Sequence, residues 1–457
     1  MRILKRLQLF LSPAKIACDK TAELEEIDRI LMSASGIDKV LAQVLRDVTG
    51  KEKSSRGREG VTAEQIVRLG ILRRRNGLSY RDLSHATKDS ISIRNFLTLA
   101  PDKFLSKSAV QGNLKKVKDS TWESLNNCLC EYAVSQKLED GAVVRGDTTA
   151  TETNIHYPTD SSLLNDSVRV ICRNLERAQD IIGVEIQYND HSRTAKAKLY
   201  KINNTRKEKD QHPHYLQLIR VAKENVRQAE LALPIIAKHQ CGDIMTGIRL
   251  DAIADQLKTY IPLAKIVIDQ AFRRIVKGEK VPVEDKIFSI FEEHTDIIVK
   301  GDREATFGHK IYLTTGKSGM LLNLTVLDGN PKDSKLVPDV LAKHKAVFGE
   351  SPEKVAFDGC FASKANRDLA KSTGVDDITF CKNNSMPIDS LLSSPKIHKF
   401  LMNFRAGIEG CISFLKRTFG FSRIFDKGCE SFSAALHMGG VAYNLTLLAR
   451  MNLAAAT

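Results

Sequence analysis

Arginine, glutamate and lysine recur at helical spacing near the C-terminal end of the chain, in the stretch SSPKIHKFLMNFRAGIEGCISFLKRTFGFSR. At 3.6 residues per turn, Arg405, Glu409 and Lys416 fall within roughly 40° of one another and form one polar stripe. Such a stripe joins an acid that can bind a metal ion to two cations that can grip phosphate groups. A surface helix with an ordinary Arg–Glu pair at i, i+4 is the commoner meaning of such a triplet.

The same stretch carries a helix start signal, because Ser394 stands at an N-cap position and Pro395 at the first helical position. Gly407 and Gly410 weaken the helix by roughly 1 kcal/mol each relative to alanine. Beside an acid they would let another backbone, such as that of nucleic acid, come close. The apolar side chains next to the polar stripe recur at i, i+3 and i+7, and they are Ile408, Cys411 and Leu415. This periodicity predicts a helix that packs on a sheet.

Two aspartates stand where strands are expected. Asp147 follows the apolar run 142–144 and is expected in a buried strand, where an ionised carboxylate is costly unless it is paired or bound to a cation. Asp358 ends the expected strand 354–357, whereas the competing acid Asp302 precedes its strand. The candidate catalytic and metal-binding residues are therefore Asp147, Asp358 and Glu409.

The elements expected around these acids alternate between strands and helices. Two strands, Phe307–Thr314 and Met320–Leu327, are joined by a glycine-containing turn. The GKS letters in that turn imitate a phosphate-binding loop, but Ile311 stands where that pattern needs a glycine, and a strand follows where it needs a helix. The remaining expected elements are the helix Ser334–Phe348, the strand 354–357, the helix Ser363–Thr373 and the strand Ile378–Cys381. Together they predict one α/β unit over residues 141–165 and 296–457.

A long helical segment interrupts this α/β unit between residues 166 and 295. Apolar residues recur there at heptad-like spacing in three seams, which begin at Val168, Ile219 and Leu250. Three seams predict an inserted helical hairpin or bundle and would also suit a dimer surface.

The N-terminal part is predicted to be helical. Residues 1–60 end in the polar, basic segment KEKSSRGREG, which is expected to be a linker, and Thr62 with Gln65 makes a capping box for a helix over Ala63–Arg75. Two shorter helices follow, so residues 61–140 resemble a helix-turn-helix-like DNA-binding region, although an ordinary bundle with a solvated basic face fits the same pattern. The arginines expected to contact DNA phosphates are Arg73, Arg74, Arg75, Arg81 and Arg94.

The whole chain is basic and long enough for two or three domains. Its 457 residues include 69 Lys and Arg against 55 Asp and Glu, which gives a formal net charge of +14. This excess favours an anionic partner, and nucleic acid is the first candidate. Nine cysteines without a CxxC pair are typical of reduced thiols in a cytosolic protein. No apolar run approaches roughly 18 residues, so no membrane partner is expected.

Taken together, these features resemble a bacterial insertion-sequence transposase of the DDE type. Arg405, Glu409 and Lys416 match the family's Tyr-Arg-Glu-Lys signature in identity and spacing, while Met402 stands at the tyrosine position. Further similar stretches are GDTTATETNIHYPTDSSLL around the first aspartate, FDGCFASKANRDLA around the second and LSYRDLSHATKDSISIRNFL near the N-terminus. The resemblance implies an α/β ribonuclease-H-like catalytic core, interrupted by an all-helical insertion and preceded by an all-helical DNA-binding region.

The chemistry of such an enzyme explains why three acids and two cations would converge. Cutting and joining DNA requires an activated nucleophile and a stabilised leaving 3′ oxygen, and two Mg²⁺ ions roughly 3.5–4 Å apart can provide both, with Mn²⁺ as a substitute. Asp147 would then bridge the two ions, Asp358 would bind one, and Glu409 the other. Arg405 and Lys416 would grip phosphates of the cleaved strand.

The resemblance thus implies a transposase that binds the terminal inverted repeats of its element in double-stranded DNA, cuts there and joins the 3′ ends to target DNA. It also implies a homodimer in a paired-end complex, in the bacterial cytoplasm and associated with the nucleoid. Two alternatives stay open, a ribonuclease-H-like nuclease that cuts without joining and a DNA-binding protein with an inactive catalytic domain. The intact acids at 147, 358 and 409 count against the second alternative.

Overall fold

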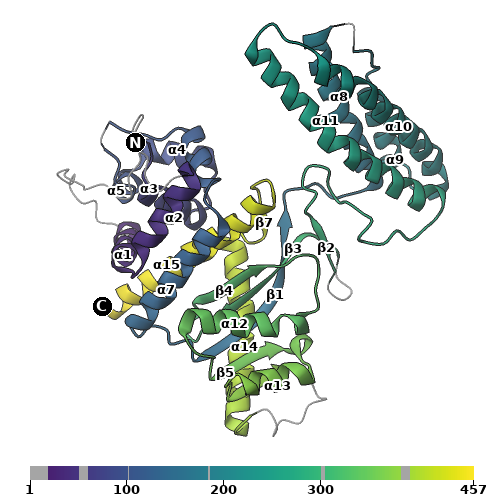
Figure 1. Ribbon diagram of the computed structural model, residues 1–457. Coiled ribbons are helices and arrows are strands. Elements are labelled where there is room, and N and C mark those ends of the chain that lie inside the picture. The colour runs from purple at the N-terminus through teal and green to yellow at the C-terminus, as the bar shows by residue number, and fades with distance from the viewer. Residues whose placement is uncertain are drawn as a thin grey trace. The chain divides into compact units, whose positions relative to one another are not determined.

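Two compact units make up the fold in a computed structural model, which describes residues 19–50, 60–100, 102–183, 186–299, 304–381 and 392–456. One unit comprises residues 1–154 and 298–457, and the other comprises residues 155–297. The expected linker at 51–59 and the competing acid Asp302 lie outside the described residues. The protein is mixed α/β, with helices in the majority and one mixed, open sheet (Figure 1).

Seven helices precede the sheet in the described part of the first unit. They are α1 (Asp19–Ser33), α2 (Ile37–Thr49), α3 (Ala63–Arg75), α4 (Tyr80–Asp89), α5 (Ile91–Phe96), α6 (Lys107–Leu114) and α7 (Asp119–Ser135). The predicted capping box opens α3, because Thr62 accepts from the amide of Gln65 and the Gln65 side chain accepts from the amide of Thr62. Of the 13 residues of α3, 12 are buried, so this helix is the centre of a bundle and not a surface helix.

The last helix of the chain, α15 (Cys429–Ala456), joins this N-terminal bundle to the sheet. It packs against α1, α3 and α7 and also against strand β4. Because of these contacts, the N-terminal helices and one side of the sheet share a single hydrophobic core. Residues 61–140, predicted as a region of their own, therefore lie in the same compact unit as the sheet.

The sheet has the strand order β2-β3-β1-β5-β6, with β4 paired to β3 and β7 paired to β1. The strands are β1 (Val143–Thr153), β2 (Asp296–Ile298), β3 (Thr306–Thr315), β4 (Leu321–Val326), β5 (Lys354–Asp358), β6 (Asp377–Cys381) and β7 (Arg423–Ile424). Strand β3 is antiparallel to β1 and β4, whereas β1, β5 and β6 run parallel. A short turn suffices for the antiparallel β3–β4 pair, and crossover helices connect the parallel strands, as parallel pairing requires.

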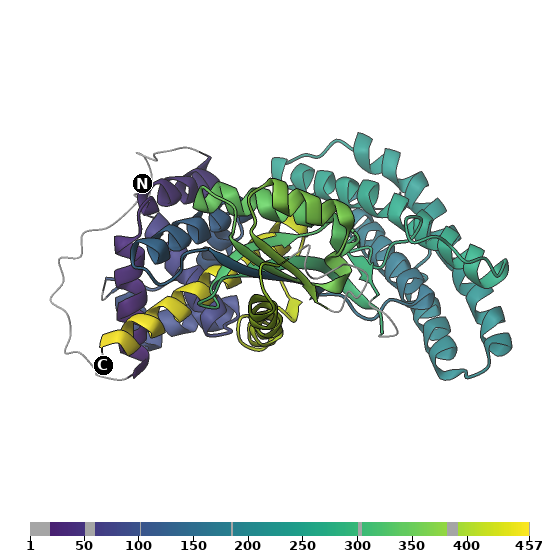
Figure 2. The same ribbon diagram turned by 90° about the horizontal axis from the view of Figure 1, so that it is seen from below.

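Helices lie on both faces of this sheet. The 3₁₀ turn η2 (Asp333–Lys335) leads into α12 (Val337–Phe348), and η3 (Gly359–Phe361) leads towards α13 (Lys364–Ser372). These segments share a core with the inward side chains of β5 and β6. Helix α14 (Pro395–Thr418) packs on β1, β5 and β6, and Figure 2 shows it end-on across the sheet from the green α12.

The sequence predicted α14 correctly in three respects. Ser394 caps its first turn by accepting a hydrogen bond from the amide of Ile397, and Pro395 is its first residue. The predicted apolar stripe of Ile408, Cys411 and Leu415 is buried, and it faces the sheet side of the helix.

The second unit is a helical bundle with its own core. Its helices are α8 (Asp160–Ile182), α9 (Ser192–Asn204), α10 (Glu208–Lys238) and α11 (Ile244–Ala271), which ends in the π-helical turn η1 (Phe272–Val276). The three seams predicted from the sequence lie on α8, α10 and α11, which pack on one another. The seams are therefore covered within the bundle, so the apolar surface we considered for dimer formation is already used inside one chain.

Candidate functional site

The pairing of β1 with β5 brings the two predicted aspartates side by side. In this parallel pair Arg145 lies opposite Ala356, and Asp147 and Asp358 each follow two residues later on their strands. Because side chains two residues apart in a strand point to the same face, both carboxylates point to the face covered by α14. Their side chains are 16% and 30% exposed, so both reach the surface.

Both aspartates are oriented in the same way by local hydrogen bonds. Oδ1 of Asp147 accepts from the amide of Thr148 at 2.7 Å, and Oδ1 of Asp358 accepts from the amide of Gly359 at 2.8 Å. The other oxygen of each carboxylate faces Arg405 on α14, with Nη2 at 3.4 Å from Asp147 Oδ2 and 3.6 Å from Asp358 Oδ2. Two carboxylates from neighbouring strands thus converge on one guanidinium group.

Glu409 completes this arrangement one helical turn further along α14. Its Oε1 accepts from Nη1 of Arg405 at 3.0 Å, and its side chain is 67% exposed. Arg405 itself is 11% exposed, and its Nε is buried without a hydrogen-bond partner. The structure therefore places Asp147, Asp358 and Glu409 around a single arginine, from three elements that are far apart in sequence. We call the surface site that these residues form the acidic groove.

Arg145, which the sequence did not single out, fixes α14 over the acids. Its Nη1 donates to the carbonyl of Phe404 at 2.6 Å, its Nε donates to Thr315 Oγ1 at 2.8 Å, and its guanidinium lies 4.6 Å from the centre of the Phe404 ring. Burial lowers the pKa of Arg145. The available signal was an arginine two residues before Asp147, on the same face of the strand.

Two glycines leave room for side chains that pack against the backbone near the acids. A Cβ on Gly407 would lie 2.1 Å from Nη1 of Arg145, and a Cβ on Gly146 would lie 2.2 Å from the hydroxyl of Tyr312. We had expected Gly407 and Gly410 to admit an external backbone. At Gly407 the close neighbour is instead Arg145 of the same chain, whereas a Cβ on Gly410 would have no atom within 4 Å.

The acidic groove opens into a cavity of about 860 Å³ on the surface of the first unit. Lys416 and Arg417 of α14 line it together with the three acids. Two further acids, Glu152 and Glu304, also line it and were missed from the sequence, although Glu152 is paired with Arg423. The result is a site with an excess of carboxylates, flanked on α14 by cations.

This donor set fits a hard divalent cation such as Mg²⁺. All three predicted ligands offer carboxylate oxygens, which Mg²⁺ prefers, and a cationic group already lies among them. The ligand oxygens of the three acids do not all lie within 4.8 Å of one another. Asp147 and Asp358, which backbone amides hold in place, would be the more rigid ligands, and the three acids would have to move closer together to share one ion.

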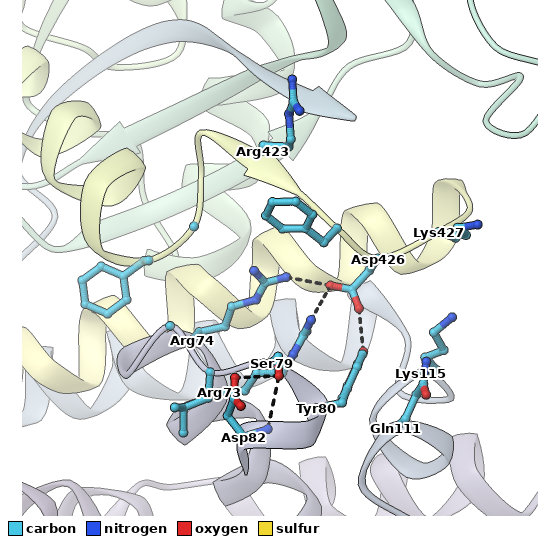
Figure 3. A pocket seen from close by; sticks show the side chains of 15 residues that line it. Arg73, Arg74, Ser79, Tyr80, Asp82, Gln111, Lys115, Arg423, Asp426 and Lys427 are labelled. Carbon is cyan, nitrogen blue, oxygen red and sulfur yellow. Dashed lines mark hydrogen bonds and ion pairs between the residues drawn. The ribbon is translucent and has the colours of Figure 1, made fainter. Parts of the chain in front are cut away.

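The arginines predicted to contact DNA phosphates have different surroundings. Arg73 and Arg74, at the end of α3, are both 8% exposed and pair with Asp426 at 3.0 and 3.2 Å (Figure 3). Arg75 pairs with Glu23 at 2.6 Å. These three guanidinium groups are thus paired with acids of the same chain, because acids distant in sequence come within reach.

The other two predicted arginines differ from each other. Arg94 donates to the carbonyls of Thr87 and Ala100 at 2.6 and 2.8 Å, which fixes the chain around α5. Arg81, near the start of α4, is exposed. Of the five predicted side chains, Arg81 is thus the one best placed to reach an external phosphate.

Comparisons of the chain with models of protein families, with curated proteins and with solved structures found no match. Within the described ranges, no helix is long and apolar enough to cross a membrane. The functional argument therefore rests on the geometry of the site.

Proposed function

We propose that the chain is a DNA transposase of the DDE type that cuts DNA at the ends of its element and joins the 3′ ends to target DNA. The observation that carries this proposal is the convergence of Asp147, Asp358 and Glu409 on Arg405. An isolated surface ion pair would need one acid, and here three acids from β1, β5 and α14 share one cation. A surplus of oxygen ligands at an open groove is what a site for divalent cations requires.

The arrangement of the strands supports a ribonuclease-H-like core. Along β4-β3-β1-β5-β6, β3 is antiparallel to both of its neighbours, while β1, β5 and β6 are parallel. The first acid lies on the central strand β1, the second at the end of the adjacent β5, and the third on a helix that covers both strands. The bundle of residues 155–297 enters this core between β1 and β2, as an insertion would.

The residues of the groove have separate roles in the proposed reaction. The oxygen of water or of a DNA 3′ hydroxyl loses its proton to solvent and forms a bond to phosphorus, while the bond from phosphorus to the 3′ oxygen of the attacked strand breaks and that oxygen takes up a proton. Bound Mg²⁺ would favour deprotonation of the attacking oxygen and stabilise the charge on the leaving oxygen. Asp147 and Asp358 would hold the cations, and their amide hydrogen bonds fix the orientation of the two carboxylates. Lys416 and Arg417 attract the DNA backbone to the groove.

The proposal also gives Arg405 a second role. Its nitrogens face the same carboxylate oxygens that a cation would use, so cation binding and the present ion pairs compete. Once displaced, the guanidinium could pair with a phosphate of the cleaved strand, as the sequence resemblance implies. Binding of cations and binding of DNA would then favour each other.

The decisive experiment uses the DNA that flanks the gene. Inverted repeats bounding the gene would supply end-containing duplexes, which are incubated with the purified full chain, target plasmid and Mg²⁺ or EDTA. We expect Mg²⁺-dependent nicks at the repeat ends and products in which those ends are joined to the plasmid. Cleavage without joined products would favour the nuclease alternative. End binding without any cleavage would favour the DNA-binding protein with an inactive catalytic domain.

A further inference from the structure

A second cavity lies in the first unit, away from the three acids of the groove. It has a volume of about 540 Å³ and is bounded by the end of α3, the start of α4, the end of α6 and the segment 419–427, which contains β7 (Figure 3). We call it the basic cavity, because five of its lining residues are Lys or Arg and two are Asp.

The charges in its wall do not balance. Arg73 and Arg74 share the single carboxylate of Asp426, which also accepts from the hydroxyl of Tyr80 at 2.6 Å. Burial and the neighbouring Arg73 lower the pKa of Arg74 to about 10, although Asp426 acts in the opposite direction. Burial raises the pKa of Asp426, but the two guanidinium groups outweigh it and lower that pKa overall.

These arginines also keep unused hydrogen-bonding capacity. Nε and Nη1 of Arg73 and Nε of Arg74 are buried without a hydrogen-bond partner. If this cluster served only to fasten α3 to the segment 419–427, one arginine would match the one carboxylate. The second buried cation costs free energy that an anion in the cavity would offset.

Two lysines extend the positive charge to the mouth of the cavity. Lys115 and Lys427 are exposed, and neither has an ion-pair partner among the described residues. The start of α4 also lines the cavity, and Ser79 caps it by accepting from the amide of Asp82. A helix N-terminus carries partial positive charge and adds to the attraction for an anion.

The short strand β7 connects the basic cavity to the acidic groove. Ser422 lines the acidic groove, and its neighbour Arg423 lines the basic cavity and pairs with Glu152 of the groove. Ser422 directly precedes β7 and Arg423 is its first residue, so the linings of the two sites are adjacent at this point of the chain. Because the two linings are adjacent, one DNA duplex is long enough to contact both sites.

We propose that the basic cavity binds a backbone phosphate of the same DNA duplex whose reacting phosphodiester lies in the acidic groove. This inference rests on the proposed function for its ligand. It assigns DNA binding to Lys115 and Lys427, which the sequence did not single out, and makes Arg73 and Arg74 the charged wall behind them.

The test measures duplex binding by the full chain in Ca²⁺ across a salt series, with a fluorescent duplex of arbitrary sequence as the probe. Each phosphate contact contributes about 0.9 to the slope of log K against log salt, so the double variant Lys115→Ala, Lys427→Ala should lower that slope by up to about 2. The matched control is Lys39→Ala, Lys345→Ala, which removes two exposed lysines from α2 and α12, outside the residues that line either site. The control should keep the wild-type slope.

Hydrogen exchange with and without the duplex locates the contact. We expect the amides of 77–82 and 425–427 to become protected in the wild type and to lose that protection in the double variant. An unchanged slope in the double variant, or the absence of duplex-dependent protection in both segments, would overturn the inference.

The two proposals fail in different ways. Wild-type protein that cuts and joins DNA, with a double variant of unchanged slope, would leave the transposase proposal standing and remove the basic cavity from it. Wild-type protein that never cuts DNA, with a slope that falls in the double variant, would support a phosphate site in the cavity and overturn the transposase proposal.

Discussion

In the acidic groove one arginine faces three carboxylates, whereas in the basic cavity two arginines share one carboxylate. Both clusters join elements that are far apart in the sequence, and both lie in the same compact unit. The surplus of charge is opposite in sign. The groove has a net negative charge that a cation can neutralise, and the cavity has a net positive charge that an anion can neutralise.

From this difference we infer that ion pairs within a protein can mark a candidate ligand site when their charges do not cancel. Removing an ionised group from water is costly unless it is paired. In a balanced pair the two charges offset this cost within the protein. An unbalanced cluster keeps a net charge that an external partner can neutralise. Arg405 is the one cation shared by the three acids, and Asp426 is the one acid shared by the two arginines. Substitutions at and around these two residues can distinguish a ligand site from ion pairs that only stabilise the fold.

The largest effect is expected from the acids of the groove. Asp147→Asn, Asp358→Asn and Glu409→Gln should each lower the cleavage rate by roughly a thousandfold or more, because several kcal/mol of metal-dependent stabilisation are lost. Gel-shift assays should show DNA binding within a few-fold of the wild type. The control is Glu152→Gln, an acid of the same groove that pairs with Arg423, and it should still cleave. Full cleavage by any of the three acid variants would remove that residue from the site.

The next effect concerns the stability of the basic cluster. Asp426→Asn leaves two buried arginines without a counter-charge and should lower the free energy of unfolding by about 3–5 kcal/mol, measured by urea denaturation. Asp82→Asn serves as the control, since Asp82 is exposed and hydrogen-bonded to Ser79. A loss no larger than that of the control would mean that Asp426 is not needed to neutralise the arginines.

The pH dependence of stability tests the same residue. The pKa of Asp426 is lowered in the folded protein, so its contribution is present above the unfolded pKa of about 3.9 and is lost as pH falls through the folded value. Denaturation series below pH 4 should therefore show a steeper loss of stability in the wild type than in Asp426→Asn. Parallel losses in the two proteins would contradict this account.

A smaller effect should show whether Arg405 competes with cations for the carboxylates of Asp147 and Asp358 or helps these carboxylates to bind them. If its guanidinium competes with cations for Asp147 and Asp358, Arg405→Ala should bind Ca²⁺ about tenfold more tightly, a change of about 1.4 kcal/mol measured by calorimetry without DNA. Arg417→Ala removes an arginine from the same helix that donates to the carbonyl of Ser413, and it should leave Ca²⁺ affinity unchanged. Weaker Ca²⁺ binding by Arg405→Ala would show that the arginine supports the ligands.

The smallest effect compares two arginines of the N-terminal helices. Arg81→Ala should lower the salt slope of duplex binding by about 0.9, because its exposed side chain can reach one phosphate. Arg94→Ala should keep the wild-type slope, since its guanidinium is already bonded to the carbonyls of Thr87 and Ala100. Fluorescence anisotropy measures both slopes. A lower slope in Arg94→Ala together with an unchanged slope in Arg81→Ala would support the sequence-based prediction that Arg94 contacts a DNA phosphate.

Local signals in the sequence predicted much of the fold. The capping box at Thr62, the N-cap at Ser394 and the hairpin of β3 and β4 all depend on residues within a few positions of one another. Asp147 and Asp358 were candidates because they stand at expected strands, and Glu409 because of its helical spacing to Arg405 and Lys416; the surroundings of all three resemble a family. The role of Arg145 could not be found in this way, because its partners Phe404 and Thr315 come from distant elements.

The sequence alone determined which residues could form helices and strands, where α3 and α14 begin, and which acids were candidates for binding a cation. These properties follow from backbone geometry, from side-chain periodicity and from residue type. The tertiary structure decided which charges meet. It brought Asp426 to Arg73 and Arg74, and so turned two predicted DNA contacts into a cavity wall, and it brought Arg405 between Asp147 and Asp358. The physical reason is that charge interactions fall off with distance in space, and the sequence does not give that distance.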